Sequence, residues 1–184
     1  MPGNPEANLE VAERIGRLLD ERNLSFVLIG AVALAAHRYI RFTEDIDLGV
    51  NADLKQMRDI AETLRSAGYD TVLHEPDAQD PLGGVIDVSG SFGLIQIISF
   101  EDRFPAVIRD ALEGEDIRIS PGSTIRVVPI PQLVALKLYA GGRKSQADII
   151  ELLRRNPEVD RDLLRQTCLN YRLRGLDDLL MELD

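Results

Sequence analysis

The chain has 184 residues, of which 45% are hydrophobic and 28% charged, so it has the size and composition of one globular domain with room for a small helical appendage. No apolar run is long enough to span a bilayer, and the N-terminus lacks the basic start and apolar stretch of a secretion signal, so we expect a cytoplasmic protein without membrane contact. The formal net charge of −10 opposes general binding to DNA, because phosphate contacts need clustered Lys and Arg.

The predicted elements of the first part of the chain alternate between helix and strand. Apolar residues recur at helical spacing from Asn8 to Arg22, and polar and apolar residues alternate from Asp45 to Val50 as in a half-buried strand. In chain order the patterns predict helix 8–22, strand 25–29, helix 31–38, strand 45–50, helix 53–67 and strand 69–73. Residues 74–84, which include two prolines and two glycines, are typical of a loop.

The second part of the chain begins with a predicted β-hairpin. Two strand-like runs, 85–89 and 94–99, flank a Gly-Ser-Phe-Gly turn. Helix 105–112 follows, then two strand-like runs, 116–119 and 124–128, and from Pro131 onward the pattern is helical. We therefore expect an α/β (α+β) fold, in which a mixed sheet with flanking helices occupies residues 1–130 and a C-terminal helical region, 131–184, packs on it without a clear linker.

Two carboxylates stand on one predicted strand. Side chains two residues apart on a strand point to the same face, so Asp45 and Asp47 lie side by side with Cα atoms roughly 7 Å apart. Carboxylates that close repel each other unless they are solvated or share a cation, and Mg²⁺ is often held by one or two carboxylates beside substrate phosphates. The pair therefore predicts a Mg²⁺ or Mn²⁺ site. The alternative is the wet face of an antiparallel strand.

A glycine precedes this strand at the start of a predicted helix. Gly30 ends an apolar run and is followed by the small residues Ala31-Val32-Ala33. Such a turn leaves backbone N–H groups free to bind a phosphate, and glycine allows close approach of the backbone. A simple tight turn is the alternative, but the glycine and the Asp pair fall within one β-α-β stretch, which favours a joint phosphate and metal site.

Two blocks of sequence, 29–34 (Ile-Gly-Ala-Val-Ala-Leu) and 41–48 (Arg-Phe-Thr-Glu-Asp-Ile-Asp-Leu), resemble the DNA polymerase β-like nucleotidyltransferase superfamily. They resemble in particular its small bacterial branch that includes AbiEii-type toxins. A later segment, 133–140 (Leu-Val-Ala-Leu-Lys-Leu-Tyr-Ala), is similar to a downstream helix of that branch that carries a lysine. The resemblance covers residues 26–153 with gaps.

The resemblance implies a mixed sheet of nucleotidyltransferase type and a Mg²⁺-dependent transfer of a nucleotidyl group from an NTP. It assigns metal binding to Asp45 and Asp47. The residues that it assigns to the nucleotide are Gly30, Ala31, Arg41, Thr43 and Lys137. The acceptor hydroxyl stays open between a tRNA end, a protein side chain and a small molecule such as an aminoglycoside, and an antitoxin or a second copy of the chain is a candidate partner.

The sequence departs from the family pattern at two positions. Ala31 stands where the family has Gly or Ser, and Gln96 stands where the family has a third carboxylate. A glutamine neither neutralises a metal nor accepts the proton of an attacking hydroxyl. If the hairpin is symmetric about Ser91 and Phe92, Asp87 lies opposite Gln96 on the same face and could supply this catalytic carboxylate. The alternative is that Asp87 lines the wet side of the hairpin.

Two functions follow. The first is an enzyme with Asp45, Asp47 and Asp87 as catalytic residues, and the second is a catalytically degenerate nucleotidyltransferase-fold protein that binds a nucleotide or a partner, within a toxin–antitoxin pair. His37 and His74 lack the spacing of a zinc site or a catalytic triad, so we assign them no role. We expect Asp148 to be a structural residue of its helix.

Overall fold

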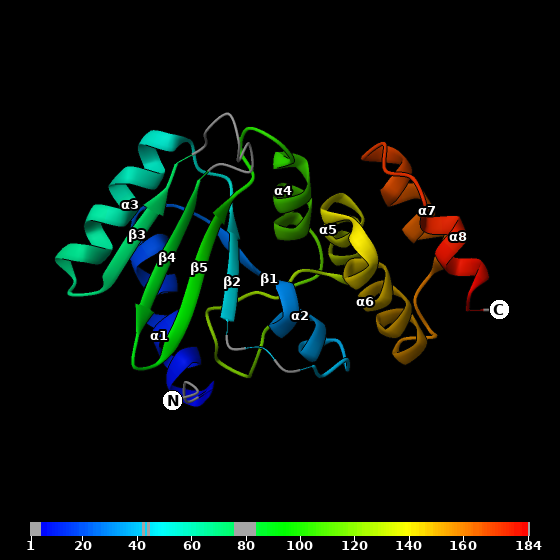
Figure 1. The fold of residues 1–184 in the computed structure, drawn as a ribbon, viewed down its shortest axis with the longest axis horizontal. Coiled ribbons are helices and arrows are strands. Elements are labelled where there is room, and N and C mark those ends of the chain that lie inside the picture. Colours follow the sequence, from blue (N-terminus) through cyan, green and yellow to red (C-terminus); the bar gives the residue numbers. More distant parts are fainter. Residues whose placement is uncertain (1–4, 42, 44, 76–83, 184) are drawn as a thin grey trace.

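The computed structural model describes residues 5–41, 43, 45–75 and 84–183. These residues form eight helices and five strands around one sheet (Figure 1). The helices are α1 (Pro5–Asp20), α2 (Gly30–Ala36), α3 (Leu54–Ser66), α4 (Pro105–Glu113), α5 (Ile130–Ala140), α6 (Gly142–Arg155), α7 (Arg161–Asn170) and α8 (Leu176–Met181). The strands are β1 (Phe26–Ile29), β2 (Asp45–Val50), β3 (Asp70–His74), β4 (Val85–Gly90) and β5 (Gly93–Ser99).

The sheet is mixed, in the order β1-β2-β5-β4-β3. The β2–β5 pair is parallel and the other three pairs are antiparallel. The β4–β5 hairpin has the expected register, because Asp87 lies opposite Gln96. The parallel pairing in turn places Gln96 beside Asp47 of β2. The α+β class and the mixed sheet predicted from the sequence are confirmed.

One part of the core lies between one face of the sheet and helices α1 and α3, which lie behind the strands in Figure 1, and the same buried cluster continues through helices α4 to α8. Alternate residues of the central strands are fully buried on this face, and each such Ile, Leu or Val contributes roughly 1.5–3 kcal/mol. They include Ile46, Leu48, Ile86, Val88, Ile95 and Ile97. On β3, β4 and β5 the opposite face points toward the viewer in Figure 1, with no described helix in front of it.

Helices α5 to α8 lie on the other side of the molecule, beyond β1 and α2 (Figure 1). Phe104, just before α4, joins them to the sheet region, because its ring lies 5.0 Å from that of Tyr139 on α5 and 4.9 Å from that of Tyr171 after α7. The Tyr171 hydroxyl also donates to Asp110 Oδ2 on α4 at 2.7 Å. None of the described helices is long and apolar enough to cross a membrane.

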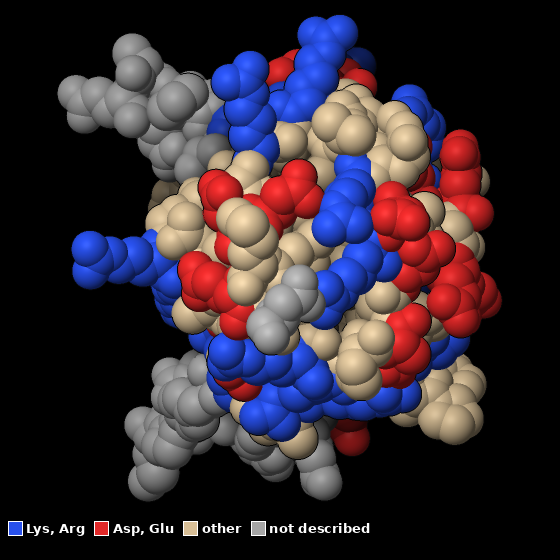
Figure 2. Space-filling view, turned by 90° about the vertical axis from the view of Figure 1, so that its right-hand side faces the viewer, with Lys and Arg blue, Asp and Glu red and all other residues tan. Residues whose placement is uncertain are grey.

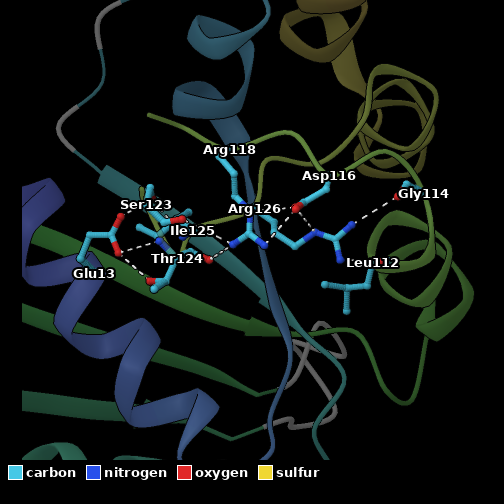
Figure 3. Close-up of polar contacts among 9 residues, drawn as sticks. All are labelled: Glu13, Leu112, Gly114, Asp116, Arg118, Ser123, Thr124, Ile125 and Arg126. Atoms are coloured by element: carbon cyan, nitrogen blue, oxygen red, sulfur yellow. Dashed lines mark hydrogen bonds and ion pairs between the residues drawn. The ribbon is translucent and has the colours of Figure 1, made fainter. Parts of the chain in front are cut away.

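Two sequence predictions are wrong in detail. Runs 116–119 and 124–128 form isolated bridges, Arg118 with Arg126 and Val127 with Leu28 of β1, instead of regular strands. Side chains hold this segment in place (Figure 3). Glu13 of α1 accepts hydrogen bonds from the Ser123 and Thr124 hydroxyls, and Asp116 pairs with both arginines.

The second error concerns the end of β3. The composition of residues 74–84 predicts that His74 opens a loop, but it is the last residue of the strand and pairs with Val85 of β4. Residues 76–83 of that loop lie outside the described residues.

Candidate functional site

The predicted carboxylates meet on the open face of the sheet. Asp45 and Asp47 are partly exposed on β2, while Ile46 and Leu48 between and beyond them are buried. Because Asp47 pairs with Gln96 and Gln96 pairs with Asp87, the three side chains form a row across β2, β5 and β4. Two strand spacings separate the ends of this row, so the Cα atoms of Asp47 and Asp87 lie roughly 10 Å apart.

The turn at Gly30 lies directly against Asp47. Its φ of +69° is a conformation that favours glycine, and a Cβ at this position would lie 1.8 Å from Asp47 Oδ2. No other residue fits there without displacing the carboxylate. The glycine therefore brings the backbone at the start of α2 directly against a predicted metal ligand, and Ala31 is buried beside it.

Asp47 carries a charge that its surroundings only partly balance. Burial, followed by the charge of Asp45, raises the pKa of Asp47 to about 6, while Lys137 and Arg41 act in the opposite direction. Among the described residues, no group of three or more His, Cys, Asp or Glu side chains could hold a metal ion by itself. Two carboxylates that repel each other fit a Mg²⁺ ion whose remaining ligands are water and substrate phosphates.

Two cations converge beside this pair, held by a buried carboxylate. Lys137 Nζ lies 2.7 Å from Asp148 Oδ2, and Arg41 Nε lies 3.4 Å from Asp148 Oδ1. The Asp148 side chain is 4% exposed and the Lys137 side chain 14%. The Lys137 ammonium is therefore largely buried and paired with a carboxylate, and is not solvated at the surface.

Asp148 is a candidate site residue that the sequence analysis interpreted only as a structural residue of its helix. It lies on α6, one helix beyond Lys137, and its helical neighbours Ile149 and Leu152 are buried. A carboxylate among buried apolar residues of an amphipathic helix is the signal that could have found it, since such a group needs a charged partner.

Thr43 has a supporting place before β2. Its hydroxyl accepts a hydrogen bond from the backbone N–H of Asp45 at 3.3 Å. This contact fixes the start of the strand that carries the Asp pair. Phe42 and Glu44, on either side of it, lie outside the described residues.

A cavity of about 390 Å³ adjoins Gly30 and Lys137. It lies between the end of the open sheet face and α5, and its volume is in the range of small-molecule sites. Its lining is mainly apolar and includes Ile29, Val85, Ile98, Phe100, Leu133, Leu136, Tyr139 and Ala140, together with Arg103 and Ser145.

The face of the molecule formed by the C-terminal helices carries both signs of charge. Figure 2 shows Lys and Arg side chains there, with Asp and Glu side chains between them.

Comparison with known proteins gives one family. The family described as "Nucleotidyl transferase AbiEii toxin, Type IV TA system" matches residues 17–182. No curated protein sequence matches the chain significantly.

Several solved structures share the fold. The solution structure of the antibiotic-resistance factor ANT(2'')-Ia is 18% identical, covers 92% of this chain and 93% of its own, and has a TM-score of 0.60. The crystal structure of ANT(2")-Ia in complex with adenylyl-2"-tobramycin is 15% identical, with coverages of 92% and 98% and a TM-score of 0.59. An antigenic nucleotidyltransferase-like protein from Paracoccidioides brasiliensis is 15% identical, with coverages of 93% and 89% and a TM-score of 0.56.

Proposed function

Because this chain belongs to the AbiEii nucleotidyl transferase toxin family, we propose that it transfers a nucleotidyl group from a Mg²⁺-bound NTP to the hydroxyl of an acceptor. The observation that supports this most is the contact between the Gly30 turn and Asp47. It joins a backbone turn suited to phosphate and a carboxylate pair suited to a divalent cation in one site. A simple tight turn would not need that proximity.

In this proposal Asp45 and Asp47 hold the Mg²⁺ or Mn²⁺ ion. When bound, the ion supplies positive charge that stabilises the developing negative charge on the phosphates. The carboxylates fix its place on the open sheet face, and Gly30 sets how closely the phosphates approach Asp47. Burial and then the charge of Asp45 raise the pKa of Asp47, so a cation bound between the two carboxylates would favour the charged form of Asp47.

The nucleotide is held from the other side of the site. Lys137 and Arg41 supply positive charge to the triphosphate, and Asp148 keeps both cations oriented. Backbone N–H groups at Gly30 and Ala31 contribute the phosphate turn, and Thr43 keeps the strand of the Asp pair in position. The cavity beside Gly30 and Lys137 is our candidate for the remainder of the nucleotide.

The chemical step is attack on the α-phosphorus. The acceptor oxygen forms a bond to that phosphorus, the bond to the bridging oxygen breaks, and pyrophosphate leaves with the electron pair. The hydroxyl proton must go to a base, and Gln96 cannot take it. We propose that Asp87, next in the row, serves this proton transfer.

The partners follow from the family and its fold relatives. Type IV toxin–antitoxin membership makes an antitoxin a partner candidate. The acceptor candidates are a tRNA end, a protein side chain and a small molecule, and the adenylyl-2"-tobramycin complex of ANT(2")-Ia is a precedent for the last. The cytoplasm supplies NTP and Mg²⁺ and is the compartment that the proposal implies.

The second candidate function is a nucleotide- or partner-binding module without catalysis. Gln96 favours it, because the position beside Asp47 on the parallel strand carries an uncharged amide. Such a protein would bind Mg²⁺-NTP but would transfer nothing.

Labelled nucleotides separate these candidates. We expect label from [α-³²P]NTP, but not from [γ-³²P]NTP, to appear in one of three acceptors: total RNA, cell protein or a set of aminoglycosides. The matched control is Asp45→Asn with Asp47→Asn, which should abolish labelling. Mg²⁺-dependent binding without any transfer would support the binding module, and transfer of the γ label would contradict the proposed reaction.

A further inference from the structure

The open face of the sheet beside the Asp pair carries further carboxylates. Besides Asp45 and Asp47 on β2, this face has Asp87 on β4 and Asp70 on β3. The residues that alternate with them along the strands are buried, so the four carboxylates share one face. The other positions of this face on β3, β4 and β5 are one histidine and uncharged polar or aliphatic residues: Val72, His74, Val85, Ser89, Leu94, Gln96 and Ile98.

The acceptor of the proposed reaction approaches over this face. Strand β2, with the Asp pair, lies between β1 and β5. The phosphate turn at Gly30 follows β1, and Lys137 comes from α5, so the departing pyrophosphate lies on the β1 side of Asp47. In phosphoryl transfer the attacking and departing oxygens lie roughly in line with the phosphorus between them. The acceptor hydroxyl therefore comes from the other side of β2, above β5 and β4.

We propose that the acceptor is a small polycation with hydroxyl groups, of the amino-sugar class, an inference that rests on the function proposed above. Its reactive hydroxyl lies beside Asp87, and one of its ammonium groups pairs with Asp70. Because Asp70 pairs with Ser89, these two carboxylates are diagonal neighbours whose Cα atoms lie roughly 7–8 Å apart. An ammonium group has no lone pair, so a hydroxyl oxygen of the same molecule is the nucleophile.

The two carboxylates differ in the contacts that they already make. Asp87 accepts a hydrogen bond from Gln96 Nε2 at 2.8 Å, and its other oxygen lies 2.9 Å from His74 Nε2. These contacts fix its side chain beside the path of the hydroxyl. Asp70 is exposed, and the hydrogen bond that it accepts from the Ser89 hydroxyl is long, at 3.4 Å. A carboxylate accepts several hydrogen bonds, so Asp70 keeps the capacity to bind a cation.

Aliphatic side chains lie among these charges. The register places Leu94 in the row of residues that joins Asp45 to Asp70. Val72, 49% exposed, lies opposite Asp87. Apolar surface with a few polar groups that fix orientation is typical of small-molecule sites. The row from Asp45 to Asp70 spans three strand spacings, roughly 14 Å, which suits a molecule of two or three sugar rings.

The end of a tRNA fits this face less well. Its chain would bring phosphates over Asp87 and Asp70, and like charges repel each other. The charge of the whole chain acts in the same direction, because residues 1–142, which contain the sheet, carry 22 acidic and 13 basic side chains. Such an excess of negative charge attracts a cation and raises its rate of association.

Three compounds separate the charge of the acceptor from its hydroxyl groups. Tobramycin carries ammonium and hydroxyl groups, spermine carries ammonium groups alone, and maltotriose carries hydroxyl groups alone. With [α-³²P]NTP and Mg²⁺, we expect label on tobramycin and none on maltotriose. Spermine should inhibit this labelling competitively with respect to tobramycin. Label on maltotriose as strong as on tobramycin, or label on total tRNA or cell protein in place of tobramycin, would overturn the inference.

Substitution of Asp70 tests the ammonium contact. Asp70→Asn should raise KM for tobramycin about 3–10-fold, with a smaller effect on kcat, and Asp70→Lys should raise it further. The matched control is Asp59→Asn, which removes an exposed carboxylate on α3, behind the sheet, and should keep the wild-type KM. Because exposed charges are screened by salt, the KM of the wild type should rise with ionic strength. Equal KM values in Asp70→Lys and the wild type would overturn the role of Asp70.

Calorimetry with Mg²⁺ and a non-hydrolysable NTP analogue gives a readout that needs no transfer. Tobramycin and spermine should bind the wild type, and Asp70→Lys should bind both more weakly. Transfer to tRNA in place of tobramycin would refute the cationic acceptor and support the proposed function. The absence of transfer to any acceptor would refute the proposed function, and the binding of the two cations would then decide by itself whether the face takes a polycation.

Discussion

Replacing Gly30 with alanine tests the contact on which the site depends. The change forces a side chain into a left-handed conformation, which costs roughly 1–2 kcal/mol. It also places a Cβ 1.8 Å from Asp47 Oδ2, closer than real atoms approach, so the carboxylate must turn away or the backbone must shift. Together these effects should lower the free energy of unfolding by about 2–4 kcal/mol, which lowers Tm by roughly 5–15 °C in a domain of this size.

Gly175 provides a control. It is also left-handed, with φ +92° and ψ 0°, but among the described residues no atom outside its chain neighbours lies within 4 Å of the Cβ that alanine would add. Gly175→Ala should therefore lower the free energy of unfolding only by the backbone term, about 1–2 kcal/mol. The difference between the two variants measures the collision with Asp47.

The assay is denaturant unfolding together with calorimetric titration of Mg²⁺-NTP. Gly30→Ala should lose nucleotide binding and Gly175→Ala should keep it. In an Asp47→Ala background the cost of Gly30→Ala should fall to that of the control, because the colliding oxygens are gone. Equal costs for the two glycine variants, with nucleotide binding intact in both, would refute the reasoning.

Three further predictions concern the charged groups. Lys137→Met leaves Asp148 buried with one remaining cation, Arg41, at 3.4 Å, so the free energy of unfolding should fall by about 3–5 kcal/mol. Adding Asp148→Asn to the same chain should partly reverse this loss. A Tm equal to that of the wild type would contradict the buried pair. The pKa of Asp47 is raised to about 6 from 3.8, so without metal its contribution to stability is complete below pH 4 and is lost as pH rises through 6. The free energy of unfolding should therefore fall by about 2–3 kcal/mol more between pH 4 and 7 in the wild type than in Asp47→Asn. Parallel pH curves for the two proteins would contradict the raised pKa. Gln96→Asp places a carboxylate beside Asp47 and against Asp87, so we expect a lower Tm without Mg²⁺ because the three carboxylates repel one another. Calorimetric scans should show that Mg²⁺ restores this Tm. A Tm that does not change with Mg²⁺ would show that the row of side chains from Asp47 to Asp87 binds no ion.

The elements that the sequence predicts well are those whose signals are local. Strand 45–50 follows from strict alternation, and the hairpin register follows from the short turn at Ser91 and Phe92, which places Asp87 opposite Gln96. The likeness to nucleotidyltransferases depends on such local blocks as well.

What the sequence does not predict depends on contacts between distant segments. The Lys137–Asp148 pair arises from the packing of α5 against α6, which no spacing along the chain specifies. The sequence pattern ends β3 one residue too early and leaves His74 in a loop, so it gives no sign of the contact with Asp87. Segment 116–128 has strand-like composition, but Glu13 and Asp116 bind its side chains and backbone in place of a regular ladder.

The most direct test of the central claim is a crystal grown with Mn²⁺ and a non-hydrolysable NTP analogue, since the anomalous signal of Mn²⁺ locates the ion without reference to the protein. We predict one anomalous peak within coordination distance of both Asp45 and Asp47, with the triphosphate lying between the Gly30 turn and Lys137. An ion bound elsewhere, or a nucleotide bound away from Gly30 with no ion at the Asp pair, would contradict the account.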